Sequence, residues 1–135
     1  MSGAALAEAA ASLVGTPFRL HGRDPVQGLD CIGLLAAAMA AIDRPLRLPT
    51  GYPMRLADLG AWLPGPESCG FSLAEPPFLP GDAILLRPGP AQFHLAIAAP
   101  DLGWVHAHAG LRLVVHDAAL PSGPILHHWR LAPAS

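Results

Sequence analysis

A cysteine and three histidines have the types and positions that acyl-transfer chemistry requires. Cys31 follows Asp30 and a turn-rich loop, and it begins the apolar run CIGLLAAAMAAI, which is typical of a helix. The first backbone N–H groups of a helix lack partners within it and carry partial positive charge, which favours a thiolate over a thiol. An ordinary thiol is only a few per cent ionised at neutral pH, so a nearby imidazolium would have to supply much of the activation. Cys31 is therefore a candidate nucleophile that needs a histidine partner.

The candidate partners lie on two neighbouring predicted strands. In FHLAI, the strand period of two places His94 on the face opposite its two sequence neighbours, and in WVHAH it places His106 and His108 on one face. If residues 99–103 form a five-residue hairpin loop, His94 lies opposite His108, with His106 one diagonal step away on the same face. The strand geometry leaves open which of the two contacts His94.

The elements that would position these residues follow an α+β pattern. Residues 3–14 and 31–42 are rich in Ala and Leu and predict two helices, the second with Asp30 at its N-cap, and residues 54–63 predict a shorter third helix. After Pro80 the sequence consists of short apolar runs separated by turn residues, which predict strands. These runs span 83–87, 93–99, 104–108 and 111–116, with a further run at 125–131. Helices first and strands later predict an α+β domain, with the helices packed on one face of an antiparallel sheet.

Length and composition narrow the class of protein. The 135 residues predict a single domain spanning 1–135. The chain contains no lysine and has a formal net charge of -2, which argues against nucleic acid as a partner. No apolar run reaches the roughly 20 residues of a membrane span, so we expect no membrane insertion. The N-terminal stretch has no basic start and contains Glu8, so we expect a helix there, and cytoplasmic synthesis without a signal peptide.

Longer motifs around these residues match a family pattern. The stretch LVGTPFRLHGRDPVQGLDCIGLLAAA, followed by PGDAILL and HLAIAAPDLGWVHAHAG, resembles the NlpC and p-sixty family of papain-like cell-wall cysteine peptidases. That family's pattern runs Gly-x-Pro-Tyr, then Asp-Cys-x-Gly-Leu on a helix, then a Gly-Asp strand and a His strand followed by a second polar residue. The resemblance covers about residues 13–115, and it implies a papain-like fold with the nucleophile at a helix N-terminus.

The resemblance also implies roles for individual residues. Cys31 would be the nucleophile, His94 the general base and His106 the residue that orients His94. Asp30 would help to hold a free amine of the substrate besides capping the helix. The implied reaction is hydrolysis of peptide bonds in peptidoglycan stem peptides, the gamma-D-glutamyl-diamino acid bond in particular, with no cofactor or metal. The small, signal-less chain also resembles the phage-tail and gene-transfer-agent subgroup, which implies phage-like tail proteins as partners.

Two positions depart from the family pattern. Phe18 stands where the family usually has Tyr, and Ile32 stands where it commonly has Ser. With Asp30 and His108, these two residues complete the predicted substrate-binding set. We expect an active hydrolase with an altered or narrowed substrate preference.

Two other interpretations remain at this point. His94, His106 and His108 could present three imidazoles to one Zn²⁺, as in three-histidine catalytic zinc centres. Alternatively, the chain is a catalytically impaired module that binds cell-wall peptides or builds a tail, which the replacements at Phe18 and Ile32 favour.

Overall fold

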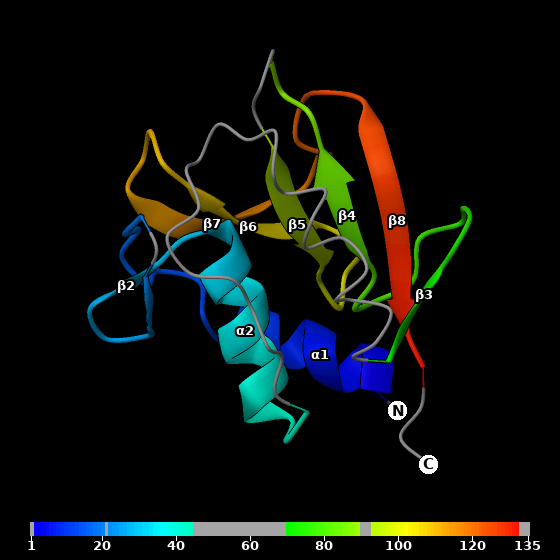
Figure 1. Ribbon diagram of the computed structural model, residues 1–135, viewed down its shortest axis with the longest axis horizontal. Helices are drawn as coiled ribbons and strands as arrows, with labels where there is room; N and C mark the ends of the chain where they lie inside the picture. The colour runs from blue at the N-terminus through cyan, green and yellow to red at the C-terminus, as the bar shows by residue number, and fades with distance from the viewer. Residues whose placement is uncertain (1, 21, 45–69, 90–92, 133–135) are drawn as a thin grey trace.

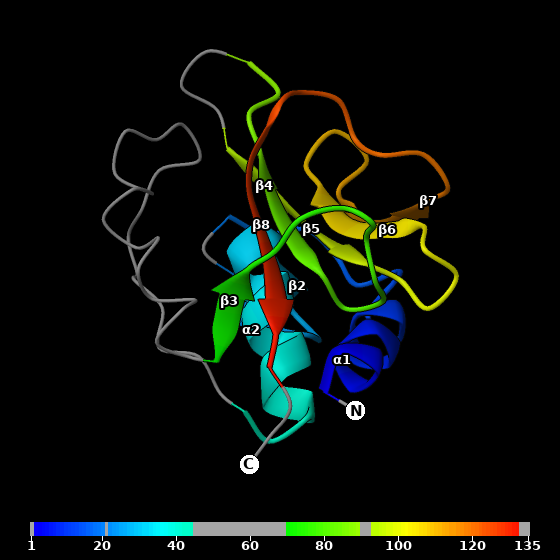
Figure 2. The same ribbon diagram turned by 90° about the vertical axis from the view of Figure 1, so that its right-hand side faces the viewer.

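In the part of the chain that the structure describes, two helices cover one face of an antiparallel sheet. The computed structural model describes residues 2–20, 22–44, 70–89 and 93–132. Helices α1 (Ser2–Ala11) and α2 (Cys31–Ala41) lie on the same side of the sheet (Figures 1 and 2). This arrangement confirms the α+β prediction, whereas the helix predicted over 54–63 lies outside the described residues. None of the described helices has the length and apolarity needed to cross a bilayer.

Over the described residues, the sheet has six strands in the order β3-β8-β4-β5-β6-β7, and all neighbours pair antiparallel. Its strands are β3 (Phe71–Leu73), β4 (Ala83–Leu86), β5 (His94–Ala98), β6 (Trp104–His108), β7 (Leu113–Asp117) and β8 (Ile125–Leu131). The predicted meander is present as β4-β5-β6-β7, and β8 returns to the other side of β4. The sequence did not predict β3, because only its first residue is buried and a strand so short shows no alternation.

Each face of the sheet has its own core. The larger core joins α2 to the helix-facing residues of the central strands, including Leu95, Ile97, Val105 and Ala107. The opposite face carries a smaller cluster formed by Ile84, Leu86, Ala96, Ala98 and Trp104, with Phe78 packed against it. Successive residues of β5 and β6 therefore point to opposite sides of the sheet, as the strand period requires.

The N-terminus of α2 is fixed by two short-range features. The Asp30 carboxylate accepts a 2.7 Å hydrogen bond from the backbone N–H of Gly33, as the predicted N-cap requires. Gly33 has no side chain, and a Cβ atom there would collide with the carbonyl oxygen of Gly22. The loop before the helix can therefore pass directly against its first turn. That loop contains a small hairpin, β1 (Arg23–Asp24) and β2 (Gly28–Leu29), which ends next to Asp30 and Cys31.

Candidate active site

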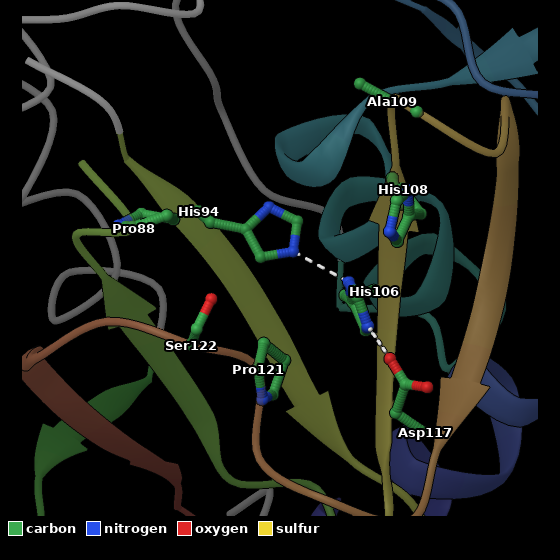
Figure 3. Close-up of a pocket in the computed structure, with 10 residues that line it drawn as sticks. Pro88, His94, His106, His108, Ala109, Asp117, Pro121 and Ser122 are labelled. Atoms are coloured by element: carbon green, nitrogen blue, oxygen red, sulfur yellow. Dashed lines mark hydrogen bonds and ion pairs between the residues drawn. The ribbon is translucent and has the colours of Figure 1, made fainter.

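Three polar side chains from neighbouring strands form a continuous hydrogen-bonded chain (Figure 3). His94 begins β5, and its Nε2 atom lies 2.8 Å from Nδ1 of His106 in the middle of β6. Nε2 of His106 lies 2.6 Å from Oδ2 of Asp117 at the end of β7. The two imidazole rings are almost perpendicular, at 89°. His94 and Asp117 are thus joined through one buried ring.

The pairing of β5 with β6 explains this contact. Ala98 pairs with Trp104 and Ile97 with Val105, so residues 99–103 form the expected five-residue hairpin loop. The backbone pairing ends at Ile97 and Val105, three residues after His94 in the sequence. The His94 side chain reaches diagonally to His106. The structure therefore selects His106 over His108 as the contact of His94.

The hydrogen-bond partners assign the tautomers of both rings. A carboxylate can only accept, so Nε2 of His106 carries a proton, and in the neutral ring its Nδ1 is the acceptor. Nε2 of His94 must then donate to that acceptor, which leaves Nδ1 of His94 as an unprotonated nitrogen. Among the described residues, this Nδ1 atom has no hydrogen-bond partner. The hydrogen-bonded chain of side chains therefore ends on a nitrogen that is free to accept a proton.

The surroundings of His94 keep its ring neutral. Burial lowers its pKa from the ordinary value of 6.5 to about 4, and the neighbouring rings of His106 and His108 add to the effect. His94 is thus an uncharged imidazole at neutral pH. It can act as a base only if a charge on the ring is stabilised during the reaction.

The hydrogen-bonded chain borders a cavity of about 500 Å³. His94, His106, His108 and Asp117 line this cavity together with Pro121 and Ser122 from the loop between β7 and β8 (Figure 3). His108 accepts a 3.0 Å hydrogen bond at Nδ1 from the backbone N–H of Leu111. His108 therefore lines the cavity but is not part of the hydrogen-bonded chain from Asp117 to His94.

Cys31 lies on the other side of β5. Its side chain belongs to the helix-facing core with Leu95 and is only 5% exposed. The backbone N–H of Leu95 faces the sulfur, so the thiol is adjacent to the residue that follows His94. In the described part of the chain, however, no hydrogen bond joins Cys31 to His94, and Cys31 does not line the cavity. The structure brings together His94 and His106 but does not link Cys31 to them.

The thiol is also protonated in this state. Burial, followed by the charge of Asp30, raises the pKa of Cys31 from 9.0 to about 12. The helix position predicted a stabilised thiolate, and that expectation is not met. Backbone N–H groups do oppose the shift, but burial and the adjacent carboxylate outweigh them.

The remaining predicted substrate-binding residues have clear packing roles. Asp30 is fully buried, and its carboxylate bonds both Gly33 and the guanidinium of Arg23, the latter at 3.2 Å. Ile32 is 1% exposed within the helix-facing core, and Phe18 is half-buried against it. Of the predicted substrate-binding residues, His108 is the one that borders the cavity.

Sequence reasoning missed Asp117. The predicted strand over 111–116 stopped one residue too early, whereas β7 continues to Asp117, which pairs with Trp104. Extending the strand by one residue would have placed Asp117 on the same face of that strand as Val115. Only the pairing of β7 with β6 shows that this is the histidine face.

The arrangement does not suit a three-histidine zinc centre. Both ring nitrogens of His106 are already engaged, one with His94 and one with Asp117. Over the described ranges, no three His, Cys, Asp or Glu residues are grouped in a way that could hold a metal ion.

Known structures share this architecture. No family model and no curated relative matches the sequence. NlpC2 from Trichomonas vaginalis is 21% identical with a TM-score of 0.70, and the match covers 95% of this chain and 47% of that chain. NlpC1 from the same organism is 21% identical with a TM-score of 0.69, and the match covers 96% of this chain and 45% of that chain. The NlpC/p60 domain of the peptidoglycan hydrolase SagA is 22% identical with a TM-score of 0.65, over 97% of this chain and 100% of that one. The chain thus spans about half of the Trichomonas proteins and the whole SagA domain. Its fold is that of NlpC/p60 domains.

Proposed function

We propose that this chain is a cysteine peptidase that cleaves stem peptides of peptidoglycan. The observation that carries the proposal is the chain from Asp117 through His106 to His94, which ends on an unprotonated Nδ1 atom next to a cavity. The fold supports it, because SagA, whose NlpC/p60 domain is similar, is a peptidoglycan hydrolase. The motif resemblance described above supplies Cys31 as the nucleophile.

In the proposed reaction, Nδ1 of His94 takes the proton of Cys31 while the sulfur attacks the scissile carbonyl carbon. The resulting imidazolium protonates the leaving amine, and the C–N bond breaks to give a thioester and a free amine. Water, deprotonated by His94, then attacks the thioester, and the sulfur leaves as the thiol. His106 holds the ring of His94 through its Nε2–H throughout both steps.

The resting protonation states shape this mechanism. The pKa of Cys31 is raised to about 12 and that of His94 is lowered to about 4, so thiol and imidazole are both neutral before substrate binds. Proton transfer must therefore accompany the attack, and substrate must bring the His94 ring within hydrogen-bond distance of the sulfur. The backbone N–H groups of Cys31, Ile32 and Leu95 face the sulfur, and they are the natural donors to the oxyanion.

We propose the gamma-D-glutamyl-diamino acid bond as the bond cut, and phage-like tail proteins as the partners that carry the chain to the wall. Both points rest on the motif resemblance. In this scheme His108 contacts the substrate in the cavity, and Phe18 borders the approach to Cys31.

The experiment is incubation with purified muropeptides, with products identified by mass. Wild type and Cys69→Ala should release the same products, and Cys31→Ala should release none. Cys69→Ala is the matched control, because it removes the second of the two cysteines. Cleavage by Cys31→Ala would refute the nucleophile assignment.

One observation favours a second candidate, a non-catalytic module that binds cell-wall peptides. The Cys31 thiol is buried and is not hydrogen-bonded to His94 in the described residues. For such a module, folded wild type would release no product but would bind insoluble peptidoglycan, and Cys31→Ala would bind equally well. Co-sedimentation with purified sacculi distinguishes the two.

A further inference from the structure

Asp117 is the last member of the hydrogen-bonded chain of side chains. The pairing of β7 with β6 places it beside His106. In β7 it pairs with Trp104, while His106 pairs with Val115, so Asp117 and His106 are diagonal neighbours on one face. The 2.6 Å contact joins a His106 side chain that is 5% exposed to an Asp117 side chain that is 51% exposed. The buried ring is therefore held at Nε2 by a carboxylate that reaches solvent.

Two histidines alone would not define which nitrogen of His94 carries the proton. A His106 ring protonated at Nδ1 could donate to Nε2 of His94, and the His94 proton would then lie on Nδ1. In that arrangement Nδ1 cannot accept a proton from a thiol. In a neutral His106 ring Asp117 excludes it, because the carboxylate on Nε2 of His106 holds the single proton of that ring on Nε2.

We propose that Asp117 is a positioning residue which, through His106, keeps Nδ1 of His94 unprotonated and ready to act as a base. The inference rests on the proposed function, and it adds a fourth member behind Cys31, His94 and His106. Asp117 itself touches neither the thiol nor the reacting atoms.

The kinetic test compares Asp117→Asn with Asp101→Asn. Asparagine keeps the shape of Asp117, but its amide can donate to His106 and reverse the chain. We expect kcat on muropeptides to fall roughly 10- to 100-fold, part of the effect of positioned proton transfer, with KM within about twofold. Asp117→Glu should recover much of the loss. Asp101 is the matched control, because it is an exposed carboxylate that bonds His116 at 2.9 Å. This pair is not part of the hydrogen-bonded chain from Asp117 to His94.

A spectroscopic test does not depend on turnover. Nitrogen-15 NMR of protein labelled at histidine should show Nε2 of His94 protonated and Nδ1 unprotonated in wild type and in Asp101→Asn. In Asp117→Asn, signal should appear for the opposite tautomer.

The outcomes separate the two proposals. An unchanged His94 tautomer in Asp117→Asn, or unchanged kcat in an active enzyme, overturns the role of Asp117. Failure of wild type to cleave muropeptides overturns the proposed function, and the tautomer measurement then still decides whether Asp117 sets the proton position.

Discussion

Two regions of the sheet contain the same pair of groups at the same distance, and they use it differently. His106 meets Asp117 at 2.6 Å, and His128 in β8 meets Asp82 at 2.6 Å. Asp82 is 1% exposed and also bonds the Arg130 guanidinium through two nitrogens, at 2.9 and 2.8 Å, and the backbone N–H of Leu79 at 3.0 Å. Asp117, in contrast, is half-exposed and has His106 as its side-chain partner.

The two pairs also end differently. Nδ1 of His128 is buried and has no hydrogen-bond partner in the described part of the chain, so that pair stops inside the fold. Nδ1 of His106, in contrast, is hydrogen-bonded to His94, which lines the cavity. Burial opposes ionisation of Asp82, but the hydrogen bonds from Arg130 and Leu79 outweigh it and lower its pKa. The Asp82 cluster thus fixes a charge within the structure, whereas the Asp117 chain leads to an open nitrogen.

The largest expected difference is in activity. His94→Gln should reduce kcat/KM on muropeptides roughly 10²- to 10⁴-fold, because it removes the proposed general base. His128→Gln should leave kcat/KM nearly unchanged, because His128 has no connection to the cavity at His94. Steady-state kinetics on the two purified variants measures both effects, and equal losses would erase the distinction between the regions.

Stability should show the opposite order. Asp82→Ala leaves Arg130 and His128 without their shared buried carboxylate, and we expect a loss of about 3–5 kcal/mol in the free energy of unfolding. Asp117→Ala removes a half-exposed partner, and we expect a loss of about 1 kcal/mol or less. Urea unfolding of both variants is the measurement, and a larger loss for Asp117→Ala would contradict the assignment of Asp82 as the structural carboxylate.

The pH dependence of stability should separate His94 from the Asp82 cluster. His94 takes up its proton near pH 4 when folded but near 6.5 when unfolded, so the unfolded state binds that proton first as the pH falls. Its contribution is fully present above pH 6.5 and is lost between about pH 6.5 and pH 4, by about 3 kcal/mol in total. His94→Gln should remove this part of the slope, whereas His128→Gln should keep it. Unfolding curves at several pH values between 7 and 4 would show the difference, and parallel curves for wild type and His94→Gln would contradict it.

Local signals made much of the fold predictable. Asp30 before a long apolar run predicted the start of α2, and the loop length between two alternating runs predicted the register of β5 and β6. Those features depend on residues close in sequence. The same alternation predicted that the three histidines share a face, although it did not select the contact.

The features that the sequence did not predict depend on how elements distant in the sequence pack against one another. The helix position of Cys31 favoured a charged sulfur, but its pKa is governed by the depth to which α2 packs on the sheet and by Asp30. The family resemblance implied a substrate contact at Ile32, where the family commonly has Ser, yet the side chain is buried in the core. The partner of His106 became visible only when β7 was placed beside β6.

The missing side chain at Gly33 links the position of Cys31 to the hairpin before it. Because the Gly22 carbonyl lies against the first turn of α2, any side chain at position 33 would push the two segments apart. An insertion or deletion in the 23–29 hairpin would be transmitted through this contact to the sulfur only two residues before Gly33. Changes in that hairpin should therefore tune the reactivity of Cys31 without altering any residue that touches the thiol.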